Sequence, residues 1–173
     1  MVIIKLRKKD KCIIRALLEN GRFSYSELGR SCGISRQVAF ERVKKLAEEG
    51  IVKRFSISLD ADKLGFSFQA YVLIIAKPEG RLRNELIEFL GNNPNVRRIQ
   101  LLFGRFDFFL EVLFQDKDEM TDFLKAIQSF GAVERTETFI VYQTIKDKPE
   151  DPFLECLADE DRISDRKKGR GDG

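Results

Sequence analysis

Residues 24–40 read SYSELGRSCGISRQVAF, and this stretch decides the fold of the front part of the chain. Ser24 and Glu27 have the spacing of a capping box, in which two side chains satisfy unpaired backbone donors at the start of a helix. The box predicts a short helix over residues 25–32, which Gly33 then breaks. A further helix follows at once, so the stretch predicts two helices joined by a tight glycine-containing turn, which is a helix-turn-helix.

The sequence on either side extends this motif into a module of three helices and a strand. Apolar residues recur at helical spacing over residues 8–19 and predict a first helix there. Ser35 is a suitable N-cap for a third helix, which we expect to run to Glu49 and to stop at Gly50. Residues 51–59 have the pattern of a strand. The module is therefore predicted to be a winged helix-turn-helix.

The second half of the chain alternates between strand-like and helix-like patterns. The predicted order is strand, helix, strand, strand, helix and strand, over residues 68–76, 82–90, 96–103, 106–114, 120–127 and 133–145. This βαββαβ order is typical of a ferredoxin-like fold, one antiparallel sheet with both helices on one face, so the fold class is α+β. Tyr71, Phe108 and Tyr142 add apolar bulk to strands that two helices cannot cover on both faces. We therefore expect this half to pair with a second copy.

The distribution of charged residues divides the chain into the same parts as the secondary-structure patterns do. Residues 1–60 hold fourteen Lys and Arg against seven Asp and Glu, which suggests a polyanionic partner. We predict a DNA-binding domain over residues 1–60, a linker over 61–66, a ferredoxin-like domain over 67–146, and a charged C-terminal tail over 147–173 that we expect to be mobile. Within the tail, Phe153, Leu154 and Leu157 have the spacing of one helical turn that docks on another part of the chain.

Composition argues against several classes of function. The chain contains no His, which removes histidine-assisted nucleophiles, imidazole bases and most zinc sites. Its three Cys have no C-x-x-C spacing, so we expect neither a disulfide framework nor a metal site, and we interpret Cys12 and Cys32 as small core residues. The apolar runs are far shorter than the roughly 20 residues of a membrane span. We expect a cytoplasmic protein with no catalytic residue, metal or cofactor.

The third helix carries the residues that we expect to meet DNA. In helix-turn-helix docking, the first residues of the recognition helix reach base edges in the major groove, which favours Arg36 for guanine and Gln37 for adenine. Basic residues farther along are expected to hold phosphates. The complete set of candidate DNA-binding residues is Arg36, Gln37, Phe40, Glu41, Arg42, Lys44, Lys45, Lys53 and Arg54. The alternative for Phe40 is packing at the edge of the module, and for Lys45 it is an i,i+4 pair with Glu41.

Both halves of the chain resemble one protein family. The front half is similar to the DNA-binding domain of the Lrp/AsnC (feast/famine) transcriptional regulators through Asn20-Gly21-Arg22, Glu27-Leu28, Cys32-Gly33-Ile34-Ser35, Arg42-Val43 and Gly50-Ile51-Val52. Segments 104–112 and 131–138 resemble the glycine-containing loop and the last strand of the family's ligand-sensing (RAM) domain. The resemblance covers about residues 6–146. Arg7 departs from it, because the family usually has an Asp there that caps the first helix.

The resemblance implies an effector site in the second half. Family members form dimers, and often octamers, through this domain, and small effectors, commonly amino acids, bind between subunits near the glycine loop. Carried over to this sequence, the effector-binding residues are Gly104, Arg105, Phe106 and Asp107. Gly104 would let backbone donors approach a carboxylate, and Asp107 would accept from an amino group.

Arg105 departs from the family, in which an acidic or small polar residue is common at that position. The Arg suits either an effector with an extra carboxylate or a loop that binds no amino acid. The alternative for the whole loop is a hairpin turn that uses Gly104 for its backbone freedom and Asp107 for a turn hydrogen bond.

These features favour a sequence-specific regulator of transcription, which binds double-stranded DNA as a homodimer or octamer and responds to an amino acid or related effector. Two alternatives remain at this point. One is an interaction protein that uses the winged helix only for docking, which the basic balance of residues 1–60 argues against. The other is a decarboxylase of the sirohaem/haem pathway built on the same two-domain plan, in which the resemblance implies catalytic histidines that this chain lacks.

Overall fold

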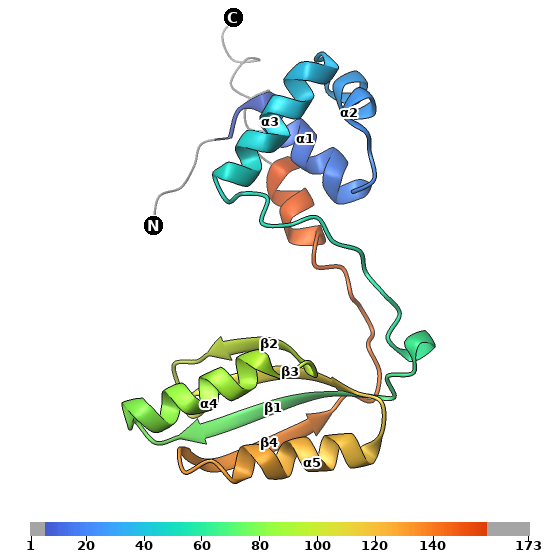
Figure 1. Ribbon diagram of the computed structural model, residues 1–173. Helices are drawn as coiled ribbons and strands as arrows, with labels where there is room; N and C mark the ends of the chain where they lie inside the picture. Colours follow the sequence, from blue (N-terminus) through green and yellow to red (C-terminus); the bar gives the residue numbers. More distant parts are fainter. Residues whose placement is uncertain (1–5, 159–173) are drawn as a thin grey trace, which may run out of the picture. The chain divides into compact units, whose positions relative to one another are not determined.

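The computed structural model describes residues 6–158 and divides them into two compact units (Figure 1). One unit is helical and contains residues 6–58 together with 146–158. The other is built on a sheet and contains residues 59–145. The last part of the predicted tail, residues 159–173, lies outside the described residues.

Three helices form the first unit where the sequence predicts them. They are α1 (Lys8–Glu19), α2 (Tyr25–Cys32) and α3 (Arg36–Glu48). Their apolar faces meet in one core, in which Ile13 of α1, Leu28 of α2 and Val43 of α3 are almost completely buried. The predicted helix-turn-helix is confirmed.

The turn between α2 and α3 depends on a very close approach of two backbone segments. A Cβ built on Gly29 would lie 2.8 Å from the carbonyl oxygen of Ile34 and 3.2 Å from the carbonyl carbon of Ser35. Neither backbone group can move aside without opening the turn, so only glycine fits in α2 at this point. Gly33 completes the turn with a left-handed φ of 61°, and its N–H donates to the Gly29 carbonyl.

The predicted capping box is present at the start of α2. Ser24 Oγ accepts from the Glu27 N–H at 3.3 Å, and Glu27 Oε2 accepts from the Ser24 hydroxyl and N–H, both at 2.7 Å. The hydroxyl bond, followed by the backbone bond, holds the pKa of the Glu27 carboxyl below its usual value. A lowered folded pKa means that the box stabilises the helix above the unfolded pKa and loses this effect as pH falls through the folded one.

The strand predicted over residues 51–59 is not formed. Residues 53–60 have no regular secondary structure, and Phe55, Ile57 and Leu59 are largely exposed. A strand needs a neighbour to pair its N–H and C=O groups, and no sheet pairing within residues 6–158 involves this segment. The alternating pattern therefore marks a segment that has no strand partner in the single described chain.

Cys12 of α1 and Cys32 at the end of α2 form a disulfide, with Cα atoms 5.8 Å apart. The expectation that the chain has no disulfide is therefore wrong. Cys32 is buried as predicted, but the sequence gives no signal for the pair because 20 residues separate the two positions. Their meeting depends on how α1 packs against α2.

The C-terminal segment returns to the helical unit. Residues 151–158 are helical, Leu157 is buried, and Arg15 Nη2 of α1 donates to the Leu157 carbonyl at 3.1 Å. Phe153 stays largely exposed. The predicted helical turn is formed, so this part of the expected mobile tail packs against α1 instead.

The second unit has the predicted βαββαβ order. After a short 3₁₀ turn, η1 (Asp62–Leu64), its elements are β1 (Phe68–Ala76), α4 (Gly80–Asn92), β2 (Val96–Leu101), β3 (Phe108–Phe114), α5 (Lys117–Gln128) and β4 (Val133–Ile140). The sheet is antiparallel with strand order β2-β3-β1-β4, which confirms the ferredoxin-like, α+β prediction. β2, β3 and β4 are each shorter than predicted.

Both helices cover the same face of the sheet (Figure 1). Ala70, Val72 and Ile74 of β1 point to that face and are fully buried against Leu86 of α4 and Ile127 of α5. The alternate residues of β1 point to the other face, which neither helix covers.

The open face of the sheet is rich in apolar side chains. Tyr71 of β1 stacks on Phe109 of β3, with ring centroids 5.3 Å apart, and Leu73 pairs with Phe109 across the ladder. Phe108 does not contribute, contrary to the sequence interpretation, because it points to the helices and is fully buried. The one-residue shift follows from the pleat, since neighbouring residues of a strand face opposite sides.

We predict that breaking the Cys12–Cys32 disulfide destabilises the protein. Closing a loop of about 20 residues removes unfolded-state entropy worth about 3 kcal/mol, so Cys12→Ala combined with Cys32→Ala should lower the free energy of unfolding by about that amount. Urea unfolding with and without a thiol reductant measures it. Cys156→Ser is the control and should respond to reductant as the parent does, because Cys156 is an unpaired, exposed thiol. A parent protein whose urea midpoint ignores the reductant would contradict the prediction.

Candidate nucleic-acid interface and effector loop

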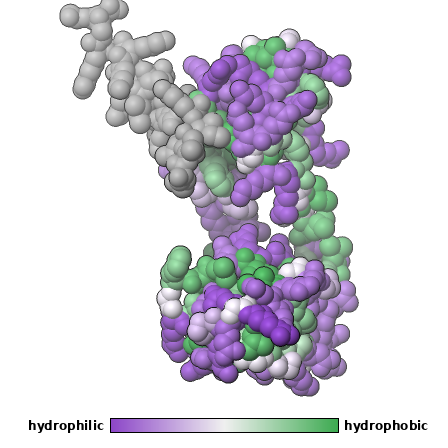
Figure 2. Space-filling model, turned by 60° about the vertical axis from the view of Figure 1, so that its left-hand side comes forward, coloured by the Kyte–Doolittle hydropathy of each residue, from purple (hydrophilic) through white to green (hydrophobic). Residues whose placement is uncertain are grey.

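The first turn of α3 presents two polar side chains to solvent. Ser35 Oγ accepts from the Val38 N–H at 3.2 Å and begins the helix as predicted. Arg36 and Gln37 follow it and are both exposed. The surface of the helical unit, the upper part of Figure 2, is mostly hydrophilic. These two candidate base-reading residues are therefore accessible to a ligand.

Gln37 is held by a neighbour on its own helix. Its Nε2 donates to Glu41 Oε1 at 2.9 Å. Because an ionised carboxylate only accepts, this bond fixes which end of the Gln37 amide points to Glu41 and leaves the amide oxygen and one N–H for another partner. Glu41, predicted as a DNA-binding residue, thus orients Gln37.

Phe40 packs at the edge of the helical unit. Its ring meets Tyr25 of α2 edge-on, with centroids 5.2 Å apart, while 42% of the residue remains exposed. This is the packing alternative that the sequence left open. The exposed edge of the Phe40 ring can still contact a ligand.

The lysines and arginines farther along lie on the surface. Lys44 pairs with Glu48 at 3.7 Å, and Lys45 pairs with Glu49 at 3.6 Å rather than with Glu41, the partner in the alternative interpretation. Both are weak i,i+4 pairs with exposed lysines, and an incoming phosphate can replace either glutamate at little cost. Beyond the helix, Lys53 and Arg54 are exposed.

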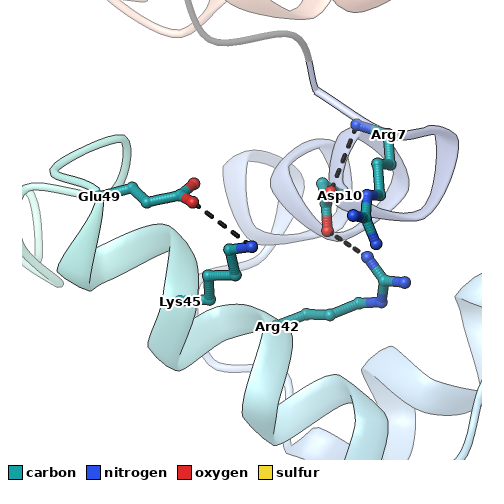
Figure 3. A network of polar contacts seen from close by, with 5 residues as sticks. All are labelled: Arg7, Asp10, Arg42, Lys45 and Glu49. Atoms are coloured by element: carbon teal, nitrogen blue, oxygen red, sulfur yellow. Dashed lines mark hydrogen bonds and ion pairs between the residues drawn. The ribbon is translucent and has the colours of Figure 1, made fainter.

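Arg42 has a different environment from the other candidates. Its Nη1 donates to Asp10 Oδ1 of α1 at 2.6 Å, and only 25% of its side chain is exposed. Figure 3 shows Asp10 lying between Arg42 and the start of α1, where its other oxygen accepts from the Arg7 N–H at 3.3 Å. Asp10 therefore takes over part of the capping that Arg7 cannot provide. Arg42 Nε is buried without a hydrogen-bond partner.

A hollow of about 360 Å³ opens beside this network, between α1 and α3. Four of its six charged lining residues form ion pairs with one another, Arg42 with Asp10 and Lys45 with Glu49 (Figure 3). The arrangement joins α3 to α1 and fixes the orientation of the recognition helix. We therefore leave Arg42 out of the phosphate contacts proposed below.

We predict that Asp10→Ala destabilises the protein by about 2 kcal/mol, because it leaves a largely buried guanidinium without its charged partner. Urea unfolding measures the loss. The matched control is Asp122→Ala, since Asp122 pairs with Lys125 at 3.8 Å and both side chains are more than 70% exposed. That variant should change the free energy of unfolding by less than about 0.5 kcal/mol. Equal effects in the two variants would contradict the assignment.

The candidate effector loop connects β2 to β3. The Leu102 N–H donates to the Asp107 carbonyl at 2.9 Å and closes the loop. Gly104 has a φ of 149°, and a Cβ built on it would meet no atom within 4 Å. The loop is therefore open above Gly104, and it is glycine's backbone freedom that this position uses.

Both carboxylate oxygens of Asp107 have partners within the sheet unit. Its Oδ2 accepts from the Ala76 N–H at 2.9 Å, and its Oδ1 pairs with Arg83 Nη1 of α4 at 3.2 Å. The Arg83 guanidinium also lies over the Phe108 ring, 4.8 Å from its centroid. These contacts give Asp107 a structural role, close to the turn alternative, instead of the predicted open acceptor for an amino group.

Arg105 points to β4. Its Nη2 lies 3.2 Å from Glu137 Oε1, and Arg135 Nη2 lies 3.0 Å from the same oxygen. The Arg105 guanidinium is also 5.2 Å from the centroid of the Phe106 ring, which the sequence had placed in the same site. We name Arg105, Arg135 and Glu137 the arginine triad.

Sequence reasoning missed Asp10, Arg83, Arg135 and Glu137. Residues 135 and 137 are two apart on a predicted strand, so alternation alone places both on one face. Their meeting with Arg105 depends on the order of strands in the sheet, which no local pattern encodes.

Within residues 6–158, no cluster of three or more acidic or cysteine side chains has the arrangement of a metal site. In the same range, no helix combines the length and apolar character that crossing a membrane requires.

Two sequence models of known domains match the chain. The model described as winged helix-turn-helix DNA-binding matches residues 6–53, and that of the Lrp/AsnC ligand binding domain matches residues 69–151. The HTH-type transcriptional regulator FL11 of Pyrococcus horikoshii is 30% identical over 150 residues, which are 87% of this chain and 98% of FL11.

Solved structures show the same architecture. Escherichia coli AsnC is 26% identical with a TM-score of 0.74, over 84% of this chain and all of AsnC. A transcriptional regulator from Neisseria meningitidis, solved in complex with L-methionine, has a TM-score of 0.79 over 86% of this chain and 99% of its own. At 24% identity, this second likeness concerns the fold.

Proposed function

Because the chain belongs to the Lrp/AsnC family of helix-turn-helix transcriptional regulators, we propose that it binds specific sites on double-stranded DNA through the exposed face of α3. The observation that carries the proposal is the accessible pair Arg36 and Gln37 at the start of α3, on a unit rich in Lys and Arg. The proposal includes no catalytic step and no cofactor, and it places the protein in the cytoplasm.

The candidate residues divide into two roles. Arg36 and Gln37 read base edges, with Glu41 orienting the Gln37 amide, because the N-terminal part of a recognition helix enters the major groove. Lys44, Lys45, Lys53 and Arg54 hold phosphates, which sets register without reading sequence. Phe40 lies at the edge of this surface beside Tyr25.

Two copies pair through the open face of the sheet. The open face carries the half-buried apolar side chains of Tyr71, Leu73 and Phe109, and a sheet face that no helix covers is the kind of surface that soluble proteins cover by association. Pairing about a two-fold axis presents two α3 helices, so half-sites lie roughly 10 bp apart, or a multiple of that, in a partly palindromic site. Octamers form from such dimers, and a small effector bound near residues 102–107 modulates DNA binding.

We predict that two substitutions in α3 have different effects on DNA binding. Arg36→Ala should weaken binding to the cognate site by about tenfold or more and relax the sequence preference, whereas Lys44→Ala should weaken binding to every duplex alike. Gel-shift titrations with the cognate site, found by footprinting the protein's own promoter region, and with a scrambled duplex measure both.

Arg81→Ala is the control for these titrations, because Arg81 is an exposed arginine of α4 in the sheet unit. It should bind both duplexes as the parent does. Affinity should fall steeply with salt, and Lys44→Ala should reduce that slope by about one. A parent protein without salt-dependent duplex binding would favour the alternative of a docking module for another protein.

We predict that a charge on the open face of the sheet prevents pairing. Leu73→Glu places an unpaired carboxylate in the proposed interface, so the protein should become monomeric at micromolar concentration. Sedimentation analysis measures the mass. Ile87→Glu is the matched control, because Ile87 is an exposed apolar residue on α4, away from that face, and should leave the assembly unchanged. A monomeric parent would contradict the proposal.

A further inference from the structure

In the arginine triad, two guanidinium groups share a single carboxylate. Arg105 and Arg135 both contact Oε1 of Glu137, at 3.2 and 3.0 Å. Neither has an ion pair with another acidic residue within the part of the chain that the structure describes. The triad therefore carries a net charge of +1 at neutral pH.

Most hydrogen-bond donors of the triad are still unused. A guanidinium has five N–H groups, and Arg105 and Arg135 each make one contact with Glu137. The two arginine side chains are 66% and 61% exposed, while that of Glu137 is 25% exposed. Because both heads lie close to the same oxygen, one small anion arriving from solvent can reach both.

The loop that supplies Arg105 also supplies apolar surface. Phe103 is fully exposed and Leu102 is 38% exposed, and both belong to the closed loop of residues 102–107. Exposed apolar residues beside a cationic pair suit a ligand with a carboxylate head and an apolar body.

The carboxylates at this place already have cationic partners. Both oxygens of Asp107 have partners, in Ala76 and Arg83, and Glu137 is surrounded by two cations. An α-amino acid brought to the triad would place its ammonium next to two guanidinium groups, without an open carboxylate to balance it. A carboxylate that has a carbonyl in place of the ammonium avoids this repulsion, and its carbonyl oxygen accepts a further guanidinium N–H.

We propose that the arginine triad binds the carboxylate of a small 2-oxo acid with an apolar side chain, in preference to the corresponding amino acid. This inference rests on the proposed function in one respect, namely that an effector bound near residues 102–107 modulates DNA binding. The binding itself involves only Arg105, Arg135, Glu137 and their loop.

Calorimetric titration of the full chain with matched ligands tests the preference. The probes are 4-methyl-2-oxopentanoate against leucine and phenylpyruvate against phenylalanine, since the members of each pair differ only at carbon 2. At least one oxo acid should bind about tenfold or more tightly than its amino acid. If neither oxo acid binds, or if the amino acids bind as well or better, the proposal is wrong.

Three variants separate ligand binding from a structural role of the triad. Arg105→Gln and Arg135→Gln should each weaken binding of the oxo acid about tenfold or more, because each removes one charge-assisted contact. Glu137→Gln should strengthen binding about threefold or more, because it leaves two cations without their internal anion. A merely structural triad would give weaker binding in all three variants, which would overturn the proposal.

Arg81→Gln is the matched control and should bind the oxo acid as the parent does, because Arg81 pairs with Glu85 within α4. Gel shifts on the parent protein report the proposed function separately. A parent that binds duplex DNA but neither oxo acid overturns this inference alone. A parent that binds the oxo acid but no duplex overturns the DNA-binding function alone.

Discussion

The recognition surface depends on the contact between the backbone of α2 at Gly29 and the turn that begins α3. A side chain at position 29 would strike the Ile34 carbonyl, so the absence of a Cβ sets how near the two helices start from one another. Three other constraints act on the same small unit. Gly33 closes the turn, the Cys12–Cys32 bond ties α1 to the end of α2, and Asp10 holds Arg42. Gly33 sets α3 against α2, Asp10 sets it against α1, and the disulfide ties α1 and α2 to each other, so the start of α3 with Arg36 and Gln37 has a fixed place on a small scaffold.

Local patterns predicted the helices and the order of strands because the information for them is local. The Ser24–Glu27 capping box, the glycine that follows α2 and the helical spacing of apolar residues all act within a few positions. Residues 51–59 show the limit of prediction from local patterns. Their alternation is that of a strand, but a strand exists only with a partner, and no segment of the single described chain supplies one. The misplacement of Phe108 has the same origin, since a one-residue error reverses the face.

The residues of the candidate sites could be predicted from the sequence, but their interaction partners could not. An exposed basic helix after a tight turn is sufficient to nominate Arg36, Gln37 and Lys44. It cannot reveal that Arg42 turns inward to an acid 32 residues earlier. Likewise, the glycine loop identified Arg105 and Asp107, but not their ion-pair partners Glu137 and Arg83, which the strand order and α4 bring to them. Long-range pairs therefore decide which members of a nominated set are open to a ligand.

The return of residues 151–158 to α1 changes how the two units are connected. The sheet unit is an insertion within the helical unit, and the backbone passes between them twice, near residues 58 and 146. Cleavage near residue 58 by a protease would separate the three helices from the rest of the backbone, so they would stay with the sheet unit only through non-covalent contacts to residues 146–158, such as the hydrogen bond from Arg15 to the Leu157 carbonyl. Truncation within residues 146–158 would convert this double tether into a single one, and would uncover the surface of α1 on which Leu157 lies.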